Sequence, residues 1–172
     1  MVTPSISIFS FFFFLFISVG FAQSIDEKKL LSDLKLLSAD ELKGRKTLSE
    51  GNKKAREHIQ SEFQGIGLKT QYAEYLQSFS FENQRENKRY EDAVNVIGFL
   101  PGLDSRKIIV ITAHYDHVGV VKINSKGDLT YNGADDNASG SAVLSTLAEY
   151  LPKNQPLHPI TFAALDRDVL RL

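Results

Sequence analysis

The chain contains no cysteine, so it can form no disulfide bond and cannot bind a metal ion through a thiolate. It also lacks an excess of charge of either sign. The 20 Lys and Arg residues oppose 21 Asp and Glu residues, and the formal net charge is −1. This balance gives no electrostatic reason to expect nucleic acid or an anionic membrane surface as a partner. Internal repeats are absent as well.

Charge is missing altogether from the first 25 residues, because all 41 charged residues lie from Asp26 onward. Seven of the 12 Phe residues lie in this uncharged leader, and its apolar run is short for a membrane span. Gly20 and Ala22 occupy the small-residue positions that precede a signal peptidase cut. We therefore predict a signal peptide over residues 1–22, a secreted or periplasmic protein, and no stable membrane association after cleavage. An uncleaved anchor is the alternative.

Residues 23–172 are long enough for one domain with a modest core. Leucines repeat along one helical face in the segment 25–38, which predicts a first helix. A second helix is predicted where Ala55, Ile59 and Phe63 recur every four residues, before glycines that can end it.

The rest of the chain has the pattern of strands. The segment 70–82 alternates loosely and predicts a strand, whereas residues 82–92 are mostly charged or amide residues and predict a solvated loop. Three short apolar runs are typical of buried strands, and they span residues 94–100, 108–112 and 160–165. The first two are separated by a segment of hairpin length, and a helix over residues 138–151 is expected between the last two. The predicted fold class is therefore α/β, with a mixed β-sheet flanked by helices.

His114 and Asp116 follow directly after the apolar run 108–112, at the carboxyl end of a predicted strand. Open α/β sheets bind ligands in the loops beyond these strand ends. Residues two apart in an extended chain point the same way, so both side chains can enter one crevice. A metal-bound imidazole usually donates its other N–H to a carboxylate, and Asp116 is placed to accept it from His114.

Asp135 and Asp136 end the next loop and precede the helix predicted over residues 138–151. One carboxylate could simply cap that helix, and Asn137 or Ser139 could do so as well. A cap does not need two adjacent carboxylates. Together with the pair that follows the preceding strand, they favour a metal site at this edge of the sheet.

The motifs TAHYDHVG and GADDNASG, followed by the strand-like ITFAALD, resemble the di-zinc aminopeptidases of peptidase clan MH. The resemblance extends over about residues 38–166. It implies zinc as the cofactor, two ions in a complete site, with His114 as a ligand, Asp116 as the catalytic carboxylate behind it, and Asp135 bridging both ions. It also implies a cis peptide bond between Asp135 and Asp136. The implied activity is removal of N-terminal residues from peptides or proteins.

The chain departs from the family pattern where a Glu-Glu pair supplies the catalytic base and a further zinc ligand. In register, Asp168 takes the position of the base, and Val169 takes the position of the ligand but cannot bind a metal. The remaining Asp and His ligands of the family would follow Leu172. We therefore expect residues 23–172 to be the N-terminal portion of a zinc aminopeptidase catalytic domain, truncated and inactive by itself.

Two other functions remain open. One is a non-catalytic binding relative of the same fold, and the other is a glutaminyl cyclase-like acyltransferase. By the same resemblance His117 is expected to be a loop residue, and His58 and His158 have no assigned function.

Overall fold

The computed structural model of the chain describes residues 25–84, 86–120 and 130–167. The predicted signal peptide over residues 1–22 lies outside the described residues, and so do Asp168 and Val169. Among the helices of the described segments, none has the length and apolar character needed to cross a membrane.

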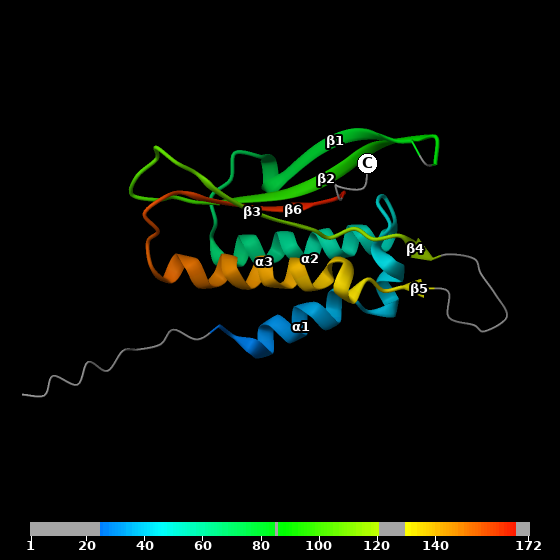
Figure 1. Cartoon of the computed structure of the whole chain (residues 1–172), viewed down its shortest axis with the longest axis horizontal. Coiled ribbons are helices and arrows are strands. Elements are labelled where there is room, and N and C mark those ends of the chain that lie inside the picture. The colour runs from blue at the N-terminus through cyan, green and yellow to red at the C-terminus, as the bar shows by residue number, and fades with distance from the viewer. Residues whose placement is uncertain (1–24, 85, 121–129, 168–172) are drawn as a thin grey trace, which may run out of the picture.

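A four-stranded mixed sheet forms one layer of the molecule, with the strand order β1-β2-β6-β3 (Figure 1). Strand β1 pairs antiparallel with β2, β2 pairs antiparallel with β6, and β6 pairs parallel with β3. The predicted α/β class with a mixed sheet is confirmed. The strands are β1 (Leu76–Asn83), β2 (Lys88–Leu100), β3 (Ile109–His114) and β6 (Ile160–Leu165).

The position of β6 corrects the expected hairpin between the segments 94–100 and 108–112. Strand β6 lies between β2 and β3 and pairs with both, so those two strands do not form a hairpin. Phe162 and Ala164 of β6 are fully buried, which suits the interior of a sheet. Strand β3 is an edge instead, and Val110 is 60% exposed, so the prediction of a buried strand at 108–112 is wrong.

The predicted loop over residues 82–92 is also largely wrong, because β1 extends to Asn83 and β2 begins at Lys88. Two exposed charged residues precede Tyr90 on this part of β2 and two follow it, whereas Tyr90 is 3% exposed and stacks on Phe81 of β1 at 5.0 Å. The charges thus face solvent from a paired strand. A short charged segment can form a strand when it pairs with a neighbouring strand and packs an aromatic side chain against it.

The three α-helices lie on one side of the sheet (Figure 1). Helix α2 carries the predicted apolar stripe of Ala55, Ile59 and Phe63, all fully buried, and Gly67 ends the helix with a φ of 77°. On α3, which forms within the predicted helix 138–151, Leu144 is 1% exposed whereas its neighbour Val143 is 45% exposed. The helices are α1 (Glu27–Leu37), α2 (Glu50–Ile66) and α3 (Ser139–Tyr150).

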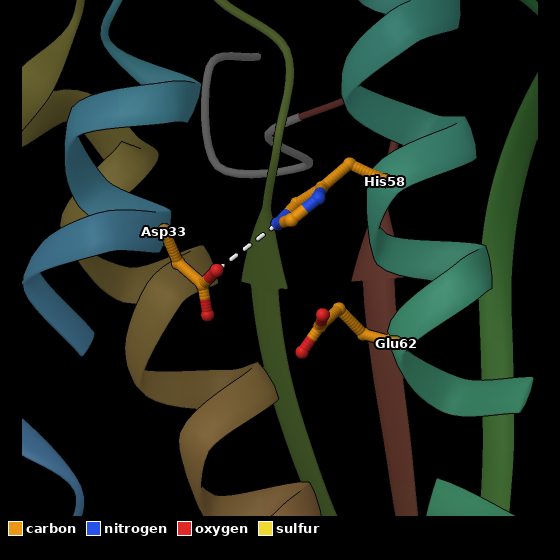
Figure 2. A group of neighbouring side chains, drawn as sticks. All are labelled: Asp33, His58 and Glu62. Atoms are coloured by element: carbon orange, nitrogen blue, oxygen red, sulfur yellow. Dashed lines mark hydrogen bonds and ion pairs between the residues drawn. The ribbon is translucent and has the colours of Figure 1, made fainter. Parts of the chain in front are cut away.

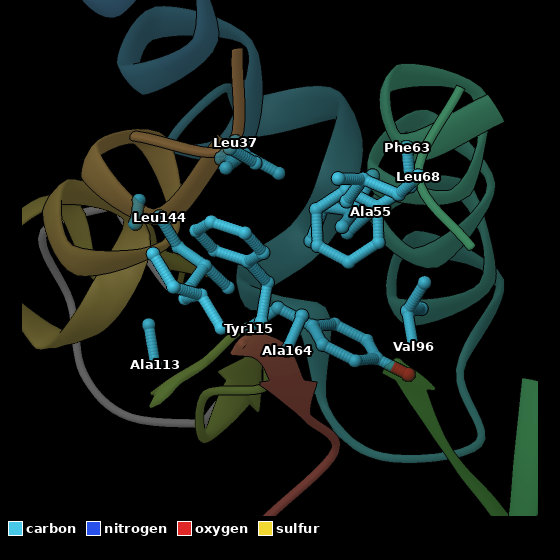
Figure 3. Packing of buried hydrophobic residues seen from close by; sticks show 14 of the residues in the cluster. Leu37, Ala55, Phe63, Leu68, Val96, Ala113, Tyr115, Leu144 and Ala164 are labelled. Carbon is cyan, nitrogen blue, oxygen red and sulfur yellow. The ribbon is translucent and has the colours of Figure 1, made fainter. Parts of the chain in front are cut away.

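The hydrophobic core lies between the helices and the sheet (Figure 3). Phe63 of α2 packs edge-on against Phe162 of β6, with ring centroids 6.4 Å apart. Leu37 of α1 and Leu144 of α3 join the same cluster and are each 1% exposed. Burial of these side chains holds the helical layer on one face of the sheet.

Short elements gather where β3 ends, and they form one edge of the molecule. A two-stranded ribbon forms between β4 (Gly119–Val120) and β5 (Thr130–Tyr131). The turn η1 (Asp40–Arg45) lies against both strands of this ribbon, and the π-helical turn η3 (Ala134–Ala138) leads into α3. Two more 3-10 turns are η2 (Ala73–Tyr75) and η4 (Leu151–Lys153).

Candidate functional site

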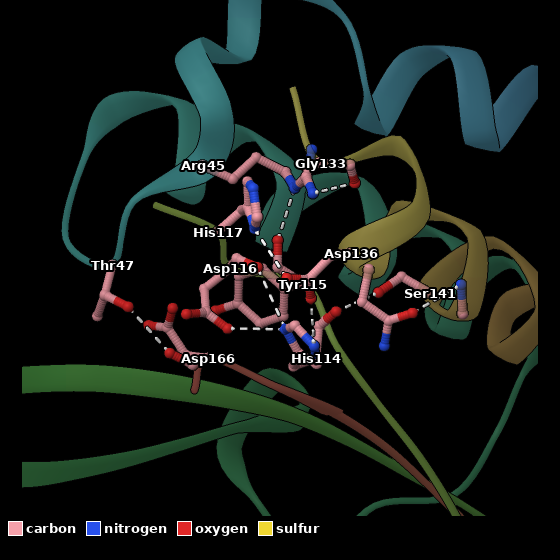
Figure 4. A network of polar contacts seen from close by, with 12 residues as sticks. Arg45, Thr47, His114, Tyr115, Asp116, His117, Gly133, Asp136, Ser141 and Asp166 are labelled. Carbon is pink, nitrogen blue, oxygen red and sulfur yellow. Dashed lines mark hydrogen bonds and ion pairs between the residues drawn. The ribbon is translucent and has the colours of Figure 1, made fainter. Parts of the chain in front are cut away.

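Four side chains meet beyond the end of β3 and are called here the strand-end cluster: His114, Asp116, His117 and Asp136 (Figure 4). The His114 Nε2 atom lies 3.2 Å from Asp136 Oδ1, and its Nδ1 atom lies 3.3 Å from Asp116 Oδ1. The side chain of His114 is 15% exposed and that of Asp136 is 41% exposed. One face of the cluster is therefore accessible from solvent.

The alternation of side chains along β3 positions the first half of this cluster. Tyr115 is fully buried, and its hydroxyl donates to Val94 O at 2.5 Å. Its backbone N–H donates to Leu165 O at 2.9 Å, which extends the β3–β6 pairing to the strand end. Because Tyr115 points into the core, His114 and Asp116 on either side of it point the other way. His114 Nδ1 lies 3.3 Å from the Asp116 carboxylate Oδ1, as the predicted pairing requires, but its hydrogen bond in the structure is with the Asp116 backbone oxygen, also at 3.3 Å.

Asp136, rather than Asp135, is the carboxylate that the structure brings to His114. Asp135 is exposed, and its backbone oxygen accepts a hydrogen bond from Ser139 Oγ. The cis peptide bond joins Asp136 to Asn137, so the prediction of a cis bond between Asp135 and Asp136 is wrong by one residue. The assignment of Asp135 as a metal ligand stays a prediction, and the observed geometry favours its neighbour.

The helix-capping alternative for the two aspartates is also resolved by the local contacts. Asn137 Oδ1 accepts the backbone N–H of Gly140 at 3.1 Å, so the amide side chain satisfies the first turn of α3. Ser141 Oγ on the same helix donates to His114 O at 2.9 Å and ties α3 to the end of β3. Asn137 thus provides a side-chain cap at this helix start, as one alternative proposed, and the Asp136 carboxylate faces the imidazole of His114.

Arg45 is a buried cation under this edge, and no feature of the sequence pointed to it. It is fully buried, and burial lowers its pKa to about 10, against the opposing effect of the Asp116 and Asp136 charges. All of its hydrogen bonds go to backbone oxygens, which fixes the loops that carry the cluster. The acceptors are Leu37 O, Tyr115 O at 2.7 Å, Asn132 O at 2.7 Å and Gly133 O at 3.0 Å.

The donor atoms of the strand-end cluster suit a zinc ion. Two donors bound to one tetrahedral zinc at 2.0–2.2 Å lie about 3.3–3.5 Å apart, close to the 3.2 Å between His114 Nε2 and Asp136 Oδ1. His117, expected to be only a loop residue, has its Nδ1 atom 3.6 Å from Asp136 Oδ2. Imidazole and carboxylate groups are common zinc ligands, so the chemistry and the spacing agree.

Asp166 follows β6 and lies beneath the same edge, fully buried. Burial raises the pKa of its carboxyl group to about 6, although hydrogen bonds from the Val94 N–H (3.0 Å) and from Asn52 Nδ2 (2.5 Å) favour the charged form. Its backbone oxygen accepts from Thr47 Oγ1 at 3.0 Å. Asp166 therefore connects α2, β2 and the segment after η1 below the strand-end cluster.

A cavity of about 270 Å³ opens beside His114 and Asp116. Its opposite wall comes from the β1–β2 hairpin and includes Phe81 and Tyr90. Residues with charged side chains also line it, so the cavity is mixed in character. They are Lys46, Glu86 and Arg167.

A second group of imidazole and carboxylate side chains lies between α1 and α2 and consists of Asp33, His58 and Glu62 (Figure 2). Together with Lys29, which pairs with both carboxylates, it is called here the helix-layer cluster. Donor atoms of Asp33, His58 and Glu62 lie within 4.8 Å of one another, a spacing that could hold a metal ion. The Lys29 ammonium lies 2.8 Å from Asp33 Oδ2 and also binds Glu62. A fixed cation thus already balances these carboxylates.

Comparison with known proteins supports the predicted resemblance. The model of peptidase family M28 matches residues 95–167, the segment that carries His114, Asp116, Asp135 and Asp136. A search of curated protein sequences finds no match to the chain. The predicted resemblance to a zinc aminopeptidase family is therefore confirmed by the family model.

Solved structures share the fold. A glutaminyl cyclase from Fimbriiglobus ruber superimposes with a TM-score of 0.67 at 18% identity, over 84% of this chain and 46% of that one. A Zn-dependent exopeptidase from Parabacteroides distasonis gives 0.65 at 19% identity, over 83% and 47%. A leucine aminopeptidase precursor from Bacteroides thetaiotaomicron gives 0.60 at 22% identity, over 83% and 47%. The chain spans about half the length of these structures.

Proposed function

We propose, from the match of residues 95–167 to peptidase family M28, that the chain is part of a zinc-dependent exopeptidase that removes N-terminal residues from peptides. The observation that carries this proposal is the 3.2 Å separation of His114 Nε2 and Asp136 Oδ1 at the carboxyl end of a strand. The named exopeptidase and aminopeptidase of similar fold support it. Export, with peptide N-termini as substrates, belongs to the same proposal.

The described residues have distinct functions in this proposal. His114 and Asp136 would hold zinc, and the second carboxylate oxygen of Asp136 lies 3.6 Å from His117 Nδ1. Asp116 orients the His114 ring and favours its metal-binding tautomer, since it lies 3.3 Å from Nδ1. When bound, zinc would lower the pKa of a water molecule and polarise the scissile carbonyl. Arg45 holds the backbone on both sides of the site.

Zinc affinity of adjacent carboxylate variants tests the proposed centre. In the metal-free full chain, titrated with zinc against a competing chelator, Asp136→Asn should weaken binding at least about tenfold. Asp135→Asn is the matched control and should stay within about twofold, because its side chain is exposed and does not face His114. Equal loss in both variants, or loss only in Asp135→Asn, would reject the assignment of Asp136.

A glutaminyl cyclase is the second candidate, since the structure from Fimbriiglobus ruber with that activity shares the fold. Cobalt substitution distinguishes the two, because the absorption of Co²⁺ reports ligands that enter its coordination sphere. Leucine phosphonic acid, whose tetrahedral group resembles a hydrated peptide carbonyl, should perturb the cobalt spectrum of an exopeptidase centre. Perturbation by a glutaminyl peptide, with none by the phosphonate, would favour the cyclase.

A further inference from the structure

The cavity beside the strand-end cluster is bounded by a structured hairpin. Phe81 of β1 and Tyr90 of β2 stack with ring centroids 5.0 Å apart and an interplanar angle of 3°. They line the same cavity as His114 and Asp116, and its volume of about 270 Å³ suits a side chain or a short terminal residue. A substrate held at His114 would have one of its groups in this cavity.

Most of the charges around the cavity are already balanced. Lys46 Nζ lies 2.9 Å from Glu86 Oε1, and the Tyr90 hydroxyl donates to the other oxygen of the same carboxylate. Asp116 faces the imidazole of His114 and lies in the field of the buried Arg45 guanidinium. These groups neutralise one another and leave little net charge to attract a ligand.

Arg167 is different. Its guanidinium lies over the Phe81 ring, 4.1 Å from the centroid, and its Nη1 donates to the backbone oxygen of Glu82 at 3.2 Å. Within residues 25–84, 86–120 and 130–167, no carboxylate forms an ion pair with it. An aromatic face and a neutral carbonyl thus position the cation, and no carboxylate of the described segments compensates its charge. A planar guanidinium held in this way is suited to accept a carboxylate through two parallel hydrogen bonds.

We propose that Arg167 binds a carboxylate of the substrate in this cavity, so that the site selects peptides with an acidic side chain or a C-terminal carboxylate close to the reacting bond. The proposal rests on the function proposed above, because it takes the occupant of the cavity to be a substrate of that site. The ring of Phe81 contacts the guanidinium and positions it. The Lys46–Glu86 pair keeps the neighbouring wall neutral and thereby leaves Arg167 as the attracting charge.

Binding without metal separates this proposal from the zinc chemistry. The full chain is kept in EDTA, and three peptides are titrated by calorimetry: Ala-Glu-amide, Ala-Gln with a free C-terminal carboxylate, and Ala-Gln-amide. At least one carboxylate peptide should bind about fivefold to tenfold more tightly than the neutral amide. The stronger of the two identifies which carboxylate is recognised. Equal affinity for all three, or no binding by any of them, overturns the proposal.

Variants then assign the effect to one side chain. Arg167→Gln should abolish the preference for the carboxylate peptide while the affinity for Ala-Gln-amide stays unchanged. Arg89→Gln is the matched control, since Arg89 lies in the same hairpin, pairs with Glu91 at 2.5 Å and does not line the cavity. Circular dichroism and thermal unfolding verify that each variant is folded. A preference for the carboxylate peptide that survives Arg167→Gln contradicts the proposal. Loss of zinc binding in Asp136→Asn without loss of this preference shows that the metal site and the carboxylate site fail independently.

Discussion

The helix-layer cluster and the strand-end cluster contain the same kinds of side chain but differ in what balances their charge. In the helix-layer cluster the Lys29 ammonium binds both carboxylates, and Asp33 Oδ1 lies 3.1 Å from His58 Nε2. Burial alone would lower the pKa of Lys29, but its hydrogen bonds to Asp33 and Glu62 raise it above the usual value. The cluster is thus an internal ion pair network that fastens α1 to α2.

In the strand-end cluster the nearby cation does not bind the carboxylates. The Arg45 guanidinium directs its hydrogen bonds to backbone oxygens, and Asp116 and Asp136 influence it only through their charge. Asp116 and Asp136 pair instead with His114 and His117, so imidazole rings rather than a Lys ammonium face these carboxylates. The comparison shows that His and Asp side chains at metal-ligand distances are not sufficient to identify a metal site. A fixed cation can already balance the charge of such carboxylates.

Arg45 is expected to have the largest effect on stability. Arg45→Met would remove a hydrogen bond from four buried or half-buried backbone oxygens, of which Gly133 O would keep the Ala138 N–H as a donor, so the free energy of unfolding should fall by about 3–5 kcal/mol. Urea unfolding followed by circular dichroism measures this. Arg106→Met is the control, because the side chain of Arg106 is 87% exposed and its loss should cost little. A loss below about 1 kcal/mol for Arg45→Met would contradict the buried network.

Asp166, which lies beneath the strand-end cluster, should make the free energy of unfolding depend on pH. Its pKa rises from 3.8 to about 6 on folding, so its contribution is full below pH 3.8 and is lost as the pH rises through 6. This contribution of Asp166 to the free energy of unfolding is about 3 kcal/mol. The difference in unfolding free energy between the protein and Asp166→Asn should change across this window. Asp92→Asn, at an exposed position, serves as the control, and a pH profile unchanged by Asp166→Asn would refute the prediction.

The zinc affinities of variants at His114 and His58 compare the two clusters directly. His114→Ala should weaken zinc affinity at least about tenfold, whereas His58→Ala should leave it within about twofold because Lys29 competes at the helix-layer cluster. The measurement is competition with a chromogenic zinc chelator on the full chain. A larger loss with His58→Ala would reverse the comparison and place the metal between the helices.

Removal of the internal cation should make the helix-layer cluster more like the strand-end cluster. Lys29→Met is expected to lower the free energy of unfolding by about 1 kcal/mol, since the ion pairs are partly exposed. It should also add a weak zinc site formed by Asp33, His58 and Glu62. Lys28→Met, an exposed neighbour, is the control for both measurements. If zinc stoichiometry does not change in Lys29→Met, these three side chains are not a latent metal site.

Several features followed from sequence periodicity because they depend on neighbours along the chain. The four-residue spacing of Ala55, Ile59 and Phe63 gave the buried face of α2, and the spacing of His114 and Asp116 placed both beyond β3 on the same side. The regular spacing of side chains along a helix or strand is sufficient to predict that such residues face the same way. The motifs that resemble the aminopeptidase family lie in the segment matched by the M28 model.

Other features were decided only by the tertiary structure. Three features depend on contacts between residues far apart in sequence. They are the placement of a strand between β2 and β3, the formation of a strand by the charged segment at Lys88, and the hydrogen bonds of Arg45 to the backbone of distant loops. The choice of Asp136 over its neighbour depends on the turn before α3, which aims one carboxylate at His114 and leaves the other exposed. The sequence by itself determined the helices and most of the strands, and it placed His114 and Asp116 at the end of β3. The fold determined the strand order and the carboxylate that meets the imidazole, because long-range packing rather than local periodicity sets both.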